Sequence, residues 1–376
     1  MLARICRRVP VLVESSSLTK TIFKSFCFSS YRTVLSPVVR LSLIPRQFCT
    51  NYGTLESKSK KVSAMSEQDI VTEELLKIFI LDKEDEDTFT ANHLGDGTWL
   101  TRNVYGGCLF AQSLVAAQKT IGPQFLPHSM HSLFILNVSP LKPVIYKIQR
   151  LRDGRSFATR FVTAHQEDKI VYSVQISFHV KEESAISHQY TMPNVEPPER
   201  FKCQWDLAKE YLDKAENGEL EVHPHIAMTM HARLEDKKTS LIESRPVNPD
   251  EVFCVVPHKS FTHLYWMKVR TPLSDDRDQH RALAAYITDA TLAGTGSRAH
   301  VSQGYTPSMV VSLDNNCWFH TDDFRVDEWM LYENESPVAN NGRAFSLGRL
   351  WTRDGRLILS AAQESLHRTK VAKSSL

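Results

Sequence analysis

The stretch DQHRALAAYITDATLAGTGSRA, residues 278–299, decides the fold that we expect. Apolar and small residues recur along it at helical spacing: Leu283, Tyr286, Ile287, Ala290 and Gly294. One stripe of the segment therefore faces a core. The sequence predicts a helix buried along this stripe, with strands on either side that cover it.

Asp289 lies inside this stretch, on a side that does not face solvent. Its neighbours at three and four residues in each direction are all apolar: Ala285, Tyr286, Leu292 and Ala293. A carboxylate in such surroundings costs free energy unless it is hydrogen-bonded or has a function, and burial should raise its pKa. Two interpretations are open. In the more common one Asp289 pairs with a backbone or hydroxyl group of a covering strand, and in the other it is a catalytic base.

Each half of the chain has the same order of predicted elements. A small-residue helix over 104–121 precedes strand patterns at 129–138, 144–152, 156–165 and 170–180. The helix around Asp289 precedes strand patterns at 308–319, 326–333, 344–352 and 357–367. At an offset of 188 residues the halves share Gly, Arg, Phe, Ile, Gln, Ser and His, at 154, 155, 157, 170, 175, 177 and 179 of the first half. We interpret this as a duplicated unit, a helix wrapped by an antiparallel meander.

The predicted fold is α+β, with two helix-wrapped antiparallel sheets joined side by side, because one such sheet alone would expose an edge and an apolar face. We expect a leader over 1–64, a first unit over 65–185, a linker over 186–215 and a second unit over 216–373. The first fifty residues hold eight basic residues, many serines and one acid, which is typical of a mitochondrial transit peptide. The last three residues, 374–376, form a Ser-Ser-Leu end that weakly resembles a peroxisomal address. The sequence leaves the organelle undecided, and Met65 is an alternative start.

Composition limits the class of function. After residue 50 the chain carries 37 basic and 42 acidic residues, so we expect no nucleic-acid partner. No apolar run approaches the roughly 18 residues that span a bilayer, so we expect no stable membrane insertion. The cysteines form no CxxC pair, and three nearby histidines, His223, His225 and His231, fit a surface loop better than a metal site. We expect neither a metal nor a cofactor.

Two further polar residues fall on core-facing strand rows. Gln363 shares a strand face with Leu357, Leu359 and Ala361, and Ser312 lies within the apolar run MVVSLD. Each is more often structural than catalytic. Together with Asp289 they can hold one water, with Asp289 as the base. The helix over 104–121 has no carboxylate although Gln175 is retained in its half, so we expect one active site per chain.

The sequence resembles the acyl-CoA thioesterase II family, and its peroxisomal branch in particular. The resemblance rests on VYGGCLFAQSLVAA, RDGRSF and VQISFHV, and on AAYITDATLAGT, VVSLDNNCWFH, VDEWMLYENESPVANNGRAF and AAQESLHR. It implies a double-hotdog fold, hydrolysis of acyl-CoA thioesters in fatty acyl-CoA metabolism, and an Asp–Ser/Thr–Gln triad that falls on Asp289, Ser312 and Gln363. The chain departs from the family at Asn315 and Ser365, where His and Gly are usual.

We predict direct hydrolysis by an activated water, with no covalent acyl-enzyme. Gly106 and Gly107 are candidates to bind the substrate at a helix start. Weaker candidates for substrate contact are Arg343, Arg349 and Trp318. The only ligand expected is the acyl-CoA substrate, and we expect a homodimer or larger assembly. Two alternatives remain open, a non-catalytic acyl-CoA-binding module and a hotdog enoyl-CoA hydratase.

Overall fold

The computed structural model describes residues 76–95 and 103–369, which all belong to one compact unit of the chain, Ser63–Leu376. The predicted leader and the Ser-Ser-Leu end lie outside the described residues. In the first half the elements are η1 (Lys77–Phe79), β1 (Asp82–Lys83), β2 (Thr88–Ala91), α2 (Gly106–Gln118), β3 (Phe125–Phe134), β4 (Val144–Asp153), β5 (Phe157–Gln166) and β6 (Lys169–Val180).

The second half opens with η2 (Pro198–Arg200), α3 (Gln204–Glu216), α4 (Pro224–Glu235), η3 (Asp236–Lys238), β7 (Ile242–Pro246), α5 (Pro249–Val252) and β8 (Thr262–Val269). Its central part is α6 (Arg277–Thr288), α7 (Leu292–Thr295) and α8 (Arg298–Val301). The remaining strands are β9 (Met309–Ser312), β10 (Asp314–Phe319), β11 (Met330–Asn340), β12 (Arg343–Thr352) and β13 (Leu357–Arg368).

The two halves share one antiparallel sheet. Its order is β1-β2-β4-β5-β6-β3-β10-β13-β12-β11-β8-β7, and β9 also pairs with β13. The halves join where β3 pairs with β10, with Met130 opposite Cys317. This join hides the edge that each half alone would expose. It confirms the predicted double hotdog, with its two sheets continuous rather than merely adjacent.

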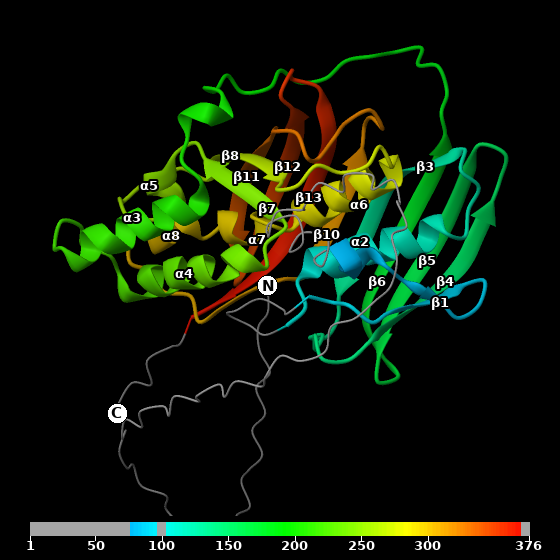
Figure 1. Cartoon of the computed structure of the whole chain (residues 1–376), viewed down its shortest axis with the longest axis horizontal. Helices are drawn as coiled ribbons and strands as arrows, with labels where there is room; N and C mark the ends of the chain where they lie inside the picture. Colours follow the sequence, from blue (N-terminus) through cyan, green and yellow to red (C-terminus); the bar gives the residue numbers. More distant parts are fainter. Residues whose placement is uncertain (1–75, 96–102, 370–376) are drawn as a thin grey trace, which may run out of the picture. The chain divides into compact units, whose positions relative to one another are not determined.

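Helices α2 and α6 lie side by side across the sheet (Figure 1). Helix α2 packs against β4, β5 and β6, and α6 packs against α2 and β10. Gly107 allows this close approach, because a Cβ there would lie 2.4 Å from the Tyr286 carbonyl oxygen. The hydroxyl of Tyr105 donates to the same oxygen at 2.9 Å. The start of α2 is therefore fixed against the last turns of α6.

The predicted helix over 278–299 is wrong beyond Thr288. Helix α6 begins after Asp276, whose side chain accepts from the N–H of Asp278, and ends with Asp289 as its C-cap. The chain then leaves the helical region at Thr291, with φ −136°, and forms the short helices α7 and α8. Asp289 is thus at a helix end, where backbone carbonyls lack helical partners and the chain can turn.

The predicted strand over 308–319 is interrupted at Leu313. The Asp314 carboxylate accepts from the backbone N–H of Glu364 at 2.6 Å, which replaces a ladder bond and separates β9 from β10. The pattern at 326–333 predicts only the start of β11, which begins at Met330 and continues past Pro337. Pro337 fits because the β11–β12 pairing is irregular between Glu335 and Val338. The interval expected as linker becomes helical at Gln204, where α3 begins.

The match of Gln175 with Gln363 is not a structural equivalence. Phe345 pairs with Glu364, but Phe157 pairs with His179 rather than with Ile176, which a constant offset of 188 would require. The β5–β6 hairpin has a shorter turn than the β12–β13 hairpin, so the register shifts. Gln363 pairs with Ser346, and the corresponding pair in the first half is Ala158 with the buried Phe178. Gln175 lies exposed on the opposite face of the sheet.

Candidate active site

Asp289 is buried between the two halves, and only 9% of its surface is exposed. Burial raises the pKa of its carboxyl to about 6, against the effect of hydrogen bonds from Gln363, Ser312 and Gly107, which lower it. The raised pKa predicted from its apolar neighbours is confirmed. At pH 7 the group is mostly ionised and basic enough to accept a proton.

Ser312 and Gln363 both donate to one oxygen of Asp289. The Ser312 hydroxyl lies 3.0 Å from Oδ1, and Nε2 of Gln363 lies 2.5 Å from the same atom. They come from β9 and β13, which pair so that Ser312 is opposite Ser365. Gln363 is 1% exposed and lies in the buried row of β13, as its strand pattern predicts. The structure therefore brings together the three residues of the predicted triad.

The other oxygen of Asp289 faces the start of α2 in the first half. The backbone N–H of Gly107 donates to Oδ2 at 2.9 Å. Gly106 leaves room for this contact, because a Cβ there would lie 2.7 Å from Oδ2 and 2.9 Å from the ring of Phe134. Of the two glycines predicted at the substrate site, Gly107 therefore donates to Asp289, and Gly106 lies close enough that a side chain there would meet it. The N–H of Gly107 is used to hold the carboxylate.

The carboxylate has one acceptor position left over. A carboxylate accepts about four hydrogen bonds. Within the described part of the chain, Oδ1 accepts two and Oδ2 accepts one. The Oε1 atom of Gln363 is buried and has no partner among the described residues. Asp289 and Gln363 can therefore each accept one further hydrogen bond.

The weaker candidates lie on the other face of the sheet. Trp318 is 37% exposed, whereas Cys317 and Phe319 beside it are buried, so Trp318 is not in the core. Arg343 pairs with Glu364 at 2.7 Å on the surface. Arg349 pairs with Glu333 at 3.1 Å. Because the buried residues of β12 alternate with these arginines, neither points toward Asp289.

Two residues that support the site were not singled out from the sequence for this role. Tyr332 on β11 donates to the Thr288 carbonyl oxygen at 2.7 Å. Asn315 on β10 donates from Nδ2 to the Thr288 hydroxyl at 2.8 Å. Both are fully buried. An alternating strand pattern shows that such residues face inward, but it does not show which backbone atom they will meet.

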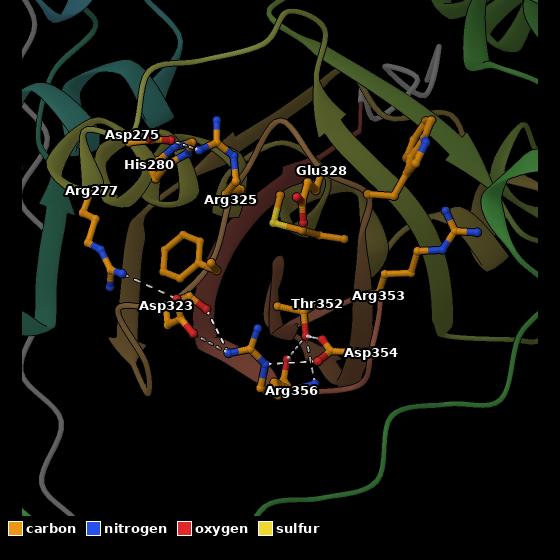
Figure 2. Close-up of a pocket in the computed structure, with 13 residues that line it drawn as sticks. Asp275, Arg277, His280, Asp323, Arg325, Glu328, Thr352, Arg353, Asp354 and Arg356 are labelled. Atoms are coloured by element: carbon orange, nitrogen blue, oxygen red, sulfur yellow. Dashed lines mark hydrogen bonds and ion pairs between the residues drawn. The ribbon is translucent and has the colours of Figure 1, made fainter.

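A hollow of about 780 Å³ lies at the opposite end of α6 (Figure 2). Its rim carries four arginines, Arg277, Arg325, Arg353 and Arg356, and each is paired with a carboxylate. Arg325, for example, contacts Asp275 at 2.5 Å. None of the triad residues lines this hollow. Its charge is largely neutralised within the protein, so we assign no chemistry to it.

Two protein-family models match this chain, one in each half. The model of the acyl-CoA thioesterase N-terminal domain matches residues 96–179, and that of the acyl-CoA thioesterase C-terminal domain matches residues 227–367. Human acyl-coenzyme A thioesterase 8 is 35% identical over 300 residues, which cover 79% of this chain and 90% of the relative. This chain belongs to the acyl-CoA thioesterase family.

Further relatives of this thioesterase support the assignment. The peroxisomal acyl-coenzyme A thioester hydrolase 1 of Saccharomyces cerevisiae is 27% identical, over 80% of this chain and 96% of the yeast protein. The crystal structure of an acyl-CoA thioesterase II, TesB2, from Mycobacterium marinum matches with a TM-score of 0.61 and 29% identity. That match covers 78% of this chain and 98% of the bacterial one. Within residues 76–95 and 103–369, no helix is long and apolar enough to span a bilayer.

Proposed function

We propose that this acyl-CoA thioesterase hydrolyses its substrate by direct attack of a water molecule held by Asp289, Ser312 and Gln363. One observation carries the proposal: two side chains from different strands and one backbone N–H from the other half all converge on a single buried carboxylate. Structural carboxylates are also buried and hydrogen-bonded. This one also contacts a glutamine whose Oε1 is buried without a partner among the described residues and can accept from a water.

The reaction requires a nucleophile and a proton acceptor. The water oxygen bonds to the thioester carbonyl carbon while one of its protons moves to Asp289. The second water hydrogen is directed toward Oε1 of Gln363, and the Ser312 hydroxyl keeps the carboxylate in place. The C–S bond then breaks, and the proton on Asp289 passes to the departing CoA sulfur. The products are a free acid and CoA, and Asp289 is again ionised.

Negative charge develops on the carbonyl oxygen during attack. The start of α2 lies beside Asp289, and the positive end of a helix stabilises such charge. The N–H of Gly107 already donates to Asp289. We therefore infer that the helix dipole of α2 and neighbouring backbone groups together stabilise the negative charge, and not the Gly107 N–H alone. The substrate-binding role of Gly106 follows from its position at the same helix start.

The test is thiol release from acyl-CoAs of different chain length by the full chain, beside Asp289→Asn. We expect turnover by the parent and a loss of about 10³-fold or more in kcat for the variant, since the base is removed. Acyl-CoA binding by Asp289→Asn should persist, which would show that the variant is folded. Near-normal turnover by this variant would refute the mechanism.

Ser312 requires its own experiment, because a serine that donates to a carboxylate resembles an activated nucleophile. We expect Ser312→Ala to keep measurable turnover, about 10- to 100-fold below the parent, since only one of three hydrogen bonds to Asp289 is lost. Mass spectrometry of rapidly quenched enzyme should find no acyl group on the protein. An acylated Ser312 would replace direct hydrolysis with a covalent route.

The two alternative functions give different results in the same assay. A binding module would take up acyl-CoA without releasing thiol from any chain length. An enoyl-CoA hydratase would add water to an enoyl-CoA and leave the thioester intact. Among the described residues, the hydrogen bonds to Asp289 come from Ser312, Gln363 and Gly107 and none comes from a histidine, which supports hydrolysis over hydration.

We further propose that the enzyme works in an organelle matrix, as a homodimer or larger assembly. The name of the yeast relative supports the peroxisome, and the composition of residues 1–50 supports the mitochondrion. Fluorescent fusions at either end separate the two, because a tag after Leu376 masks a C-terminal address and a tag before Met1 masks an N-terminal one. Light scattering of the purified chain measures the assembly.

A further inference from the structure

The last residue of α6, Thr288, is held from two strands. Its carbonyl oxygen accepts from the Tyr332 hydroxyl on β11 at 2.7 Å, and its side-chain hydroxyl accepts from Asn315 on β10 at 2.8 Å. The Thr288 hydroxyl in turn donates to the Ala285 carbonyl at 2.7 Å. Thr288, Tyr332 and Asn315 have no exposed surface. The end of α6 therefore has little freedom to move.

The Thr288 carbonyl belongs to the peptide bond that leads into Asp289. A peptide unit is planar, so fixing the direction of its carbonyl also fixes the N–H of Asp289 and the plane from which its Cα extends. The φ torsion of Asp289, which is −83°, and its side-chain torsions then place the carboxylate, and the bonds from Ser312, Gln363 and Gly107 hold it there. The Tyr332 contact thus acts on the peptide unit that directly precedes Asp289.

Gly348 on strand β12 leaves space for the Tyr332 hydroxyl. Gly348 lies across from Asn334 in the β11–β12 pairing, and a Cβ at Gly348 would lie 2.6 Å from the Tyr332 hydroxyl oxygen. The glycine is in the middle of a strand, where it has no turn to make and weakens the sheet. Its position is explained if the hydroxyl must reach Thr288.

We propose that Tyr332 is a positioning residue for catalysis: its hydroxyl fixes the Thr288–Asp289 peptide plane and so aims the carboxylate of Asp289, in a space that Gly348 keeps open. This inference rests on the proposed role of Asp289 as the base. Tyr332 does not touch the substrate in this scheme. Its effect is on the rate of the chemical step and not on substrate binding.

The first test is Tyr332→Phe, which removes one oxygen and keeps the ring. We expect kcat to fall about tenfold, the rate equivalent of roughly one hydrogen bond, while KM stays within about twofold. The pH dependence of kcat/KM should shift as well, because the carboxylate is less well placed for its three donors. The matched control is Tyr146→Phe. Tyr146 is also fully buried and donates to Gln112 at 2.6 Å, but in the first half on β4.

The second test uses Gly348→Ala, which places a methyl group where the Tyr332 hydroxyl lies. We expect it to reproduce the fall in kcat. The double variant Gly348→Ala/Tyr332→Phe should lose less in kcat than the product of the two single losses, because the hydroxyl 2.6 Å from the added methyl is gone, although the ring, at 2.8 Å, must still move. A merely structural role for the two residues would instead give additive losses of stability with kcat unchanged.

The possible failures are distinguishable. If Tyr332→Phe and Tyr146→Phe have the same kcat and the same pH profile as the parent while Asp289→Asn is inactive, the positioning role is refuted and the proposed mechanism stands. If Asp289→Asn retains turnover, the mechanism itself is refuted. If the kcat losses of the two single variants multiply in the double variant, Gly348 and Tyr332 act separately, which overturns the coupling between them.

Discussion

The backbone N–H of Gly107 lies 2.9 Å from Oδ2 of Asp289, so the first half of the chain holds the buried carboxylate of the second. Asp289 and its two side-chain partners all belong to the second half, yet the proposed site is incomplete without the start of α2. The corresponding strand position in the first half carries Phe178 where the second carries Gln363. At this strand position only the second half therefore carries a polar side chain, and the first half forms part of the wall of the proposed site.

This contact makes Gly106 a sensitive position. Gly106→Ala places a methyl group within 2.7 Å of Oδ2 of Asp289 and 2.9 Å of the Phe134 ring, so the carboxylate or the helix start must move. Because misplacing a catalytic group by about 1 Å can cost about 100-fold, we expect kcat to fall by 10- to 100-fold. Steady-state thiol release measures this effect.

The control for Gly106→Ala is Gly294→Ala in α7. A Cβ at Gly294 would come no closer than 3.4 Å, to the end of the flexible Arg298 side chain. We expect this variant to keep parental kcat and to gain slightly in stability, as a helical glycine replaced by alanine does. Equal losses in both variants would show that Gly106 matters for folding and not for the placement of Asp289.

The pKa of Asp289 predicts how activity depends on pH. The base acts only when ionised, so with a pKa of about 6 in the free enzyme kcat/KM should fall about tenfold per pH unit below that value. Gln363 and Ser312 lower the pKa of Asp289 through their hydrogen bonds. Gln363→Ala should therefore move the midpoint of the profile to higher pH, in addition to lowering its plateau. A midpoint that stays in place would show that another group controls the profile.

Much of this fold and site can be predicted from the sequence, for definite reasons. Asp289 stands out because its helical neighbours are apolar, and Gln363 because its strand alternates. What the sequence does not give is register. The turn between β5 and β6 is shorter than the one between β12 and β13. Gln175 and Gln363 therefore match in the sequence repeat but lie on opposite faces of the sheet. The contact of Tyr332 with Thr288 depends on how a strand crosses a helix end, which no local pattern specifies.

The arginines on the sheet face opposite to Asp289 can be used to test whether CoA binds on that face. Arg343 is exposed, is paired with Glu364 at 2.7 Å, and lies on the face opposite to Asp289. We expect Arg343→Ala to leave both KM and kcat within about twofold, since an exposed ion pair contributes little. Trp318 lies on the same face, and we expect Trp318→Ala also to leave KM and kcat within about twofold. A large rise in KM in either variant would place part of the substrate on this face.

The raised pKa of Asp289 also predicts an effect on stability. The folded-state value of about 6 exceeds the ordinary value of 3.8, so between these values the folded protein binds more protons than the unfolded chain. Stability from this group is therefore present at low pH and lost as pH rises toward 6. Asp289→Asn cannot titrate, so its unfolding free energy, relative to the parent, should rise by about 2 kcal/mol from pH 4 to pH 7. Denaturant titrations of both proteins at several pH values measure the difference. A constant difference across this range would mean that Asp289 titrates alike in the folded and unfolded states, which would remove the physical basis for its role as a base near neutral pH.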